Sequence, residues 1–151
     1  MTPVPGQEAD TKILELLRTH DDRERAVLAA YQTLIDESTD EGIGYLGQLI
    51  LDDEQRHHEI LGQMADRVDG WKTGGGAAGT PSLTPRVDRA LLDETRRLIA
   101  LERADAKELR KLQKELRYAP ATSLLPLLVK LMLQDNAKHI EILKFVRTYA
   151  G

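Results

Sequence analysis

The chain has 151 residues, the size of one ordinary domain, and 41% of them are hydrophobic, which is enough for one continuous core. Its formal net charge of −4, without a basic block, argues against nucleic acid as a partner, and no apolar run approaches the roughly 20 residues of a membrane span. Cysteine is absent, which excludes disulfides and thiolate metal ligands, and the first ten residues lack the features of a signal peptide, so the cytoplasm is the expected location.

Two helices are predicted in the first half, over residues 10–37 and 40–68. Asp10 or Thr11 is the expected cap of the first, and Ser38 followed by Glu41 forms a capping-box pattern that is expected to open the second. Gly42, Gly44 and Gly47 are expected to permit the close approach of a neighbouring backbone. The residues expected on the inner faces recur at heptad-like spacing: Ile13, Leu17, His20, Glu24, Val27, Tyr31 and Leu34, then Ile43, Leu46, Ile50, Asp53 or Glu54, His57, Leu61, Met64 and Val68.

Residues 69–84 contain five glycines and one proline, and are expected to form a flexible linker. Beyond it, two more helices are predicted over residues 85–117 and 123–148, the first with Thr84 as its cap and Pro85 in its first turn. Pro126 is tolerated because it falls in the first turn of the second. The expected inner faces are Leu91, Thr95, Leu98, Glu102, Asp105, Leu109, Leu112 and Leu116, then Leu124, Leu128, Leu131, Asp135, His139, Ile142 and Val146.

These elements predict an all-α fold in which residues 1–151 form a single domain. The four helices are joined by a short, a long and a short connection. This pattern predicts an antiparallel four-helix bundle with one long crossover between the second and third helices.

Polar residues interrupt every predicted inner face near the middle of its helix. The interrupting residues are His20 and Glu24, then Asp53, Glu54 and His57, then Glu102 and Asp105, then Asp135, Asn136 and His139. In the bundle these four interruptions would lie at one height, where several buried carboxylates are costly unless something compensates their charge. A pair of divalent ions would do so, because Glu and His three residues apart lie on one face of a helix. Protonation, or internal pairing with a cationic histidine or arginine, would also do so.

Glu54-x-x-His57 and the echo of residues 53–61 in residues 135–143 are similar to the motifs of the ferritin-like superfamily, which includes ferritins, bacterioferritins, rubrerythrins and diiron-carboxylate oxidases. Residues 53–57, Asp-Glu-Gln-Arg-His, also match the Asp-Glu-x-Arg-His form of diiron oxygenases and desaturases. The resemblance covers residues 10–148. It implies a site for one or two iron ions, or other divalent metals, and ferroxidase or oxygen- or peroxide-reducing activity. The ligands it implies are Glu24, Glu54, His57, Glu102 and His139.

Asn136 stands where the resemblance requires a second ligand Glu. Asp105 or Asp135 is a candidate substitute ligand, although Asp135 lies about 100° round the helix from that position. A mononuclear site, an asymmetric site and no site are therefore all open. The alternative function is a non-enzymatic bundle whose polar network serves dimerisation or partner binding. Oxygenation of an organic substrate is a third option.

Several other residues have expected roles beside the site. Asp53 and Asp135 are interpreted as carboxylates that orient a ligand histidine, and His20 as a candidate extra ligand. His58 is expected to point away from the site into solvent, and the mixed-sign run 102–117 is expected to be a solvated, salt-bridged face. Residues 124–134 are apolar on more than one side, which favours a homodimer packed through helices.

Overall fold

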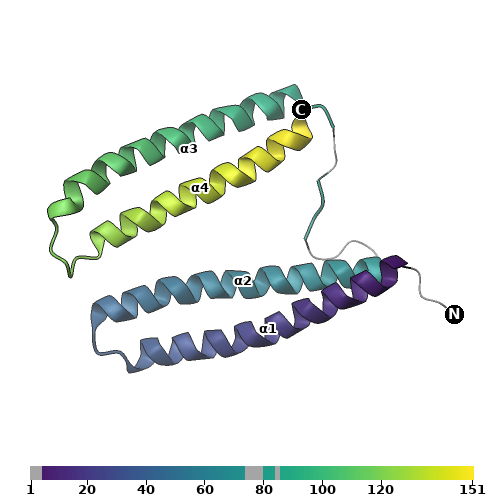
Figure 1. Cartoon of the computed structure of the whole chain (residues 1–151), viewed down its shortest axis with the longest axis horizontal. Helices are drawn as coiled ribbons and strands as arrows, with labels where there is room; N and C mark the ends of the chain where they lie inside the picture. Colours follow the sequence, from purple (N-terminus) through teal and green to yellow (C-terminus); the bar gives the residue numbers. More distant parts are fainter. Residues whose placement is uncertain (1–4, 74–79, 84–85) are drawn as a thin grey trace. The chain divides into compact units, whose positions relative to one another are not determined.

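The computed structural model describes residues 5–73, 80–83 and 86–151, and for residues 5–7 and 71–73 it describes the backbone alone. This part of the chain is α-helical and contains no β-strand, which confirms the all-α fold class. Residues 1–82 and 83–151 are two compact units, and each contains one helical hairpin (Figure 1). The first hairpin consists of α1 (Pro5–Glu37) and α2 (Glu41–Thr73). The second consists of α3 (Arg89–Glu115), a short 3₁₀ helix (Leu116–Tyr118) and α4 (Leu125–Ala150).

The helix boundaries differ from the predicted ones at both ends of the helices. Helix α1 begins at Pro5, so the prediction that Asp10 or Thr11 caps it is wrong, because both lie inside the helix. Helix α2 is capped by Asp40 rather than Ser38, because Asp40 Oδ1 accepts hydrogen bonds from the backbone N–H groups of Gly42 (2.8 Å) and Ile43 (3.2 Å). Helix α2 also runs on to residue 73, so residues 69–73 of the predicted linker are helical. Residues 74–79, and the predicted cap at residues 84 and 85, lie outside the described residues.

The segment before α3 is hydrogen-bonded to the C-terminal end of α4. Asp88 caps α3 by accepting a hydrogen bond from Leu91 N, so this helix begins four residues later than predicted. The backbone N–H groups of Arg86 and Asp88 donate to the carbonyl groups of Tyr149 and Ala150, at the end of α4. Pro126 lies in the first turn of α4, as predicted.

The interface between the two helices of each hairpin has a strict three-and-four spacing. On α2 the buried and half-buried positions include 47, 51, 54, 58, 61, 65 and 68, and on α4 they include 129, 133, 136, 140, 143, 147 and 150. This spacing is the heptad pattern of two helices that pack along their length. Apolar residues expected on inner faces lie beside this interface and are exposed within the hairpins, among them Ile13, Ile43, Ile50, Leu131 and Ile142.

Gly47 shows why a small residue is needed at one position of the first interface. A Cβ atom at Gly47 would lie 3.0 Å from Ile35 Cγ1, which is closer than such contacts normally are. Gly47 therefore lies in a close contact, but with a side chain of α1, so the predicted close approach of a backbone is wrong at this position. A Cβ at Gly44 would meet nothing within 4 Å, so the prediction is wrong for that position.

Candidate metal site in the first hairpin

The first hairpin brings together three of the predicted ligands. Glu24 on α1 and Glu54 on α2 both occupy interface positions, and His57 lies one turn beyond Glu54 on the same helix. One ligand atom from each of Glu24, Glu54 and His57 lies within 4.8 Å of the other two. Among the described residues, no other group of three histidine or carboxylate side chains meets this distance.

Among the described residues, the two carboxylates of this triad form no ion pair with a lysine or an arginine. Glu24 is 8% exposed, and its Oε2 atom is buried without a hydrogen-bond partner among the described residues. Two ionised carboxylates have no proton to donate, so Glu24 and Glu54 form a hydrogen bond only when one of them is protonated. That hydrogen bond, then burial and the negative charge of Glu24, raise the pKa of Glu54, while His57 lowers it.

Two histidines lie beside this carboxylate pair. His57 Nδ1 is 3.6 Å from Glu54 Oε2, and His20 Nε2 is 3.4 Å from Glu24 Oε1. Both histidine side chains are 56% exposed, so each imidazole can replace a contact with water by a contact with a metal ion. The arrangement offers two carboxylates and one or two imidazoles to a cation, which is a ligand set suited to iron, zinc and manganese.

A further polar pair lies one interface layer away. His58 Nδ1 is 2.7 Å from Asp21 Oδ1, and their side chains are 30% and 22% exposed. The prediction that His58 points into solvent is therefore wrong, because His58 occupies the interface and His57 lies at its edge. The spacing Leu51, Glu54, His58 and Leu61 carried this signal, because it continues the three-and-four pattern of the interface.

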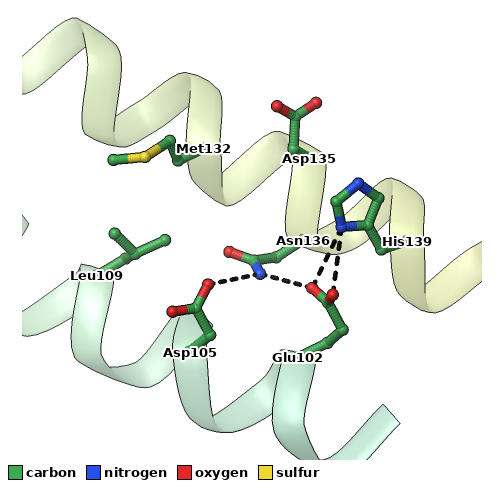
Figure 2. Close-up of a pocket in the computed structure, with 7 residues that line it drawn as sticks. All are labelled: Glu102, Asp105, Leu109, Met132, Asp135, Asn136 and His139. Atoms are coloured by element: carbon green, nitrogen blue, oxygen red, sulfur yellow. Dashed lines mark hydrogen bonds and ion pairs between the residues drawn. The ribbon is translucent and has the colours of Figure 1, made fainter. Parts of the chain in front are cut away.

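The second hairpin places the corresponding residues in a hydrogen-bonded network (Figure 2). Asn136 is 5% exposed, and its Nδ2 atom donates to Glu102 Oε2 (2.7 Å) and Asp105 Oδ2 (3.0 Å). His139 Nδ1 lies 3.3 Å from Glu102 Oε1. Asn136 thus links two carboxylates as a neutral double donor, at the position where α2 has Glu54.

This network lines an open pocket of about 250 Å³ on one side of the second hairpin. Leu109 and Met132 form its apolar wall, and Figure 2 shows Asp135 pointing away from Asn136 and Glu102. Asp135 pairs with Lys138 (3.2 Å), and Asp53 is an exposed residue of α2. The contacts of the described residues thus do not link Asp135 to a ligand histidine.

Comparisons with protein-family models, with curated proteins and with solved structures found no match. No helix in the described ranges is both long enough and apolar enough to cross a membrane. The residue geometry of the two hairpins is therefore what supports a functional proposal.

Proposed function

We propose that the first hairpin binds a divalent transition-metal ion, iron above all, through Glu24, Glu54 and His57. The observation that carries this proposal is the buried, unpartnered Oε2 atom of Glu24 beside a second carboxylate. A buried carboxylate is costly without a positive partner, and within the described residues His20 lies 3.4 Å from Oε1 while Oε2 has no hydrogen-bond partner. A cation held between the two carboxylates and His57 would remove that cost.

The chemistry of the bound ion would be oxidation of Fe(II) or reduction of oxygen or peroxide, as the resemblance to ferritin-like proteins implies. The residues of the hairpin would supply ligands and hold them in place, and the redox change would belong to the metal. His20 lies close enough to Glu24 to orient its carboxylate or to serve as a further ligand.

We also propose the ferritin-like arrangement itself, a four-helix bundle with one crossover between α2 and α3. The apolar side chains that each hairpin leaves exposed beside its polar residues support this proposal, because a helical pair alone cannot cover them. Scattering from the monomeric chain should then give a radius of gyration of about 15 Å, and a clearly larger value would contradict a single bundle. The homodimer through the apolar helix α4 stays a prediction.

Metal binding is tested by titrating the metal-free full chain with Fe(II) in the absence of oxygen. We expect about one ion per chain, because the hairpin contains one group of three ligands. The variant Glu54→Ala/His57→Ala should lose this ion, whereas the matched variant Glu102→Ala/His139→Ala should retain it. Faster oxygen consumption by the loaded wild type than by the ligand variant would support the redox activity.

The alternative function, a non-enzymatic bundle for dimerisation or partner binding, is favoured by the second hairpin. There Asn136 satisfies the carboxylates without an ion. A wild-type chain that binds no Fe(II), and that keeps its stability in a chelator, would support this alternative and overturn the metal proposal.

A further inference from the structure

The two units of the chain carry opposite formal charges. Residues 1–82 contain 16 acidic and 7 basic side chains, a net charge of −9, whereas residues 83–151 contain 9 acidic and 14 basic side chains, a net charge of +5. The overall value of −4 therefore hides a strong asymmetry. Such an asymmetry indicates an electrostatic partner for at least one of the two units.

Five of the 14 basic side chains of the second unit form one row along α3. We call this row the basic stripe, and it consists of Arg96, Arg103, Lys107, Arg110 and Lys114. Its three arginines are seven residues apart, nearly two helical turns, so they repeat on one side of α3 about every 10.5 Å. All five side chains are exposed.

The basic stripe is not neutralised by its own helix. Arg103, Lys107, Arg110 and Lys114 have no acidic residue three or four positions away in either direction. In the described part of the chain none of these four forms an ion pair, and Arg96 comes only within 3.9 Å of Asp93. The prediction that residues 102–117 form a salt-bridged face is wrong for this row, because the basic side chain there that pairs with an acid is Lys111, with Glu108.

Like charges four residues apart destabilise a helix slightly, so this row has an unfavourable arrangement within α3 alone. Lys107 lies four residues after Arg103, and Lys114 four residues after Arg110. A negatively charged surface bound along this row would make the same charges stabilising rather than destabilising.

The first hairpin carries a row of acids with the same repeat. Asp52, Glu59 and Asp66 lie seven residues apart on α2, all three are exposed, and we call them the acidic stripe. Asp52 accepts a hydrogen bond from Gln48 (2.8 Å), and no ion pair engages Glu59 or Asp66 within the described residues. Because both rows repeat about every 10.5 Å, three ion pairs can form together when two such helices lie alongside each other.

We propose that the basic stripe of the second hairpin docks on the acidic stripe of the first hairpin in a second copy of the chain. Each copy carries both stripes, so the contact joins two different surfaces and can be made twice in a closed pair or repeated along a chain of copies. The net charge of −9 on the first unit, together with an acidic row of the same repeat, supports a second copy as the occupant.

The proposal predicts self-association that depends on salt. The test is sedimentation velocity of the full chain in the presence of a chelator, at low and at high salt. The average mass at low ionic strength should exceed the average mass at high salt. That excess should disappear at about 1 M salt, where charges are screened beyond about 3 Å. The chelator separates this result from metal binding. A mass that does not change between the two conditions would overturn the proposal.

A charge exchange identifies the two surfaces. Arg103→Glu/Arg110→Glu and Glu59→Arg/Asp66→Arg should each weaken the low-salt association about tenfold or more. A mixture of the two variants should restore it, because each reversed stripe then meets a reversed partner. The control Arg97→Glu/Lys111→Glu changes the charge of α3 equally, but off the stripe, and should associate like the wild type.

Two further measurements keep the test decisive. Circular dichroism verifies that each variant is folded, and the milder Arg103→Gln/Arg110→Gln replaces the reversal if the helix is perturbed. Duplex DNA serves as a polyanion probe. If the stripe binds DNA while the chain shows no salt-dependent self-association, or if the mixed variants do not recover association, the second copy is the wrong partner.

Discussion

In the first hairpin, Glu24 faces Glu54 across the helix interface, and in the second Glu102 faces Asn136 at the corresponding positions. One layer away, the first hairpin has Asp21 beside His58. Three residues before Glu102 on α3 and four after Asn136 on α4, the second hairpin has two isoleucines, at positions 99 and 140. The two hairpins therefore share an interface pattern and fill its central layers with different chemistry.

This difference shows how one side chain decides whether a carboxylate cluster needs a cation. Asn136 donates two hydrogen bonds from one nitrogen, so Glu102 and Asp105 are satisfied within the hairpin. Glu54 can donate to Glu24 only when it is protonated, which is why its pKa is raised. In the ionised state the carboxylates of the first hairpin have no such donor between them, whereas in the second hairpin the acceptor that stays buried without a partner among the described residues is Asn136 Oδ1.

The largest effect is expected when Asn136→Glu copies the first hairpin into the second. The change removes the double donor and adds a third carboxylate beside Glu102 and Asp105, so the metal-free free energy of unfolding should fall by about 3 kcal/mol. Urea unfolding with and without Mn²⁺ measures this, and the variant should recover stability with the ion. Gln134→Glu, an exposed amide-to-acid change on the same helix, should have little effect. Equal effects at the two positions would contradict the role of Asn136.

The next effect concerns the polar layer that the second hairpin lacks. Asp21→Ala or His58→Leu removes one partner of a 2.7 Å pair at the interface, and each should cost about 1–2 kcal/mol by thermal or urea unfolding. Asp21 keeps its contact with Arg25 (3.6 Å) when His58 is replaced, so the cost of His58→Leu should be the smaller of the two. The double variant Asp21→Ile/His58→Ile reproduces the isoleucine layer and should be at least as stable as the wild type. Asp22→Ala controls for the loss of an exposed acid on α1. A double variant less stable than either single one would show that the pair is needed for more than charge balance.

The helices themselves follow from local patterns in the sequence, so their number and order were predictable. Their first turns were not, because Ser38 and Asp40 are both good caps and the choice between them depends on the turn that precedes α2. The buried face was predicted about one position away from the interface, since apolar residues such as Ile43 and Ile50 flank the interface on α2. A helix with two apolar sides does not reveal from sequence which side its hairpin partner covers.

The candidate site was predictable to the same extent. The Glu24, Glu54 and His57 group follows from spacing on two helices, and the structure brings the three residues together. The position of His58 in the interface was not predictable, because a shift of the buried face by one residue places His58 in the interface and His57 at its edge. The two hydrogen bonds donated by Asn136 could not be predicted either. The sequence shows that a ligand Glu is missing at this position, but not that the amide in its place donates to both carboxylates.

A smaller effect is expected when Glu54→Asn copies the second hairpin into the first. The new amide can donate to Glu24 as Asn136 donates to Glu102, so the metal-free chain should gain about 1 kcal/mol near neutral pH. The same variant should lose the Fe(II) site in the anaerobic titration. Gln55→Asn, on an exposed position of the same helix, controls for the change in helix propensity. A variant that keeps its iron would place the ion elsewhere.

The smallest effect is the pH dependence of the first hairpin. The hydrogen bond to Glu24, together with burial, raises the pKa of Glu54 in the folded chain above its ordinary value of 4.5. A raised carboxyl pKa means that its contribution to stability is full below the unfolded pKa and is lost as the pH rises through the folded pKa. Relative to Glu54→Gln, the metal-free wild type should therefore become less stable as the pH is increased from about 4 to 8.

Fe(II) should reverse this trend, because an ion binds the ionised carboxylates and displaces the proton that Glu24 and Glu54 share. Its affinity should rise with pH over the same interval in which the metal-free chain loses stability. Unfolding curves and Fe(II) titrations at matched pH values measure the two halves of this linkage, with Glu59→Gln as the control for removing a carboxylate from α2. If both quantities were independent of pH, the shared proton would be absent, and the comparison between the hairpins would rest on Asn136 alone.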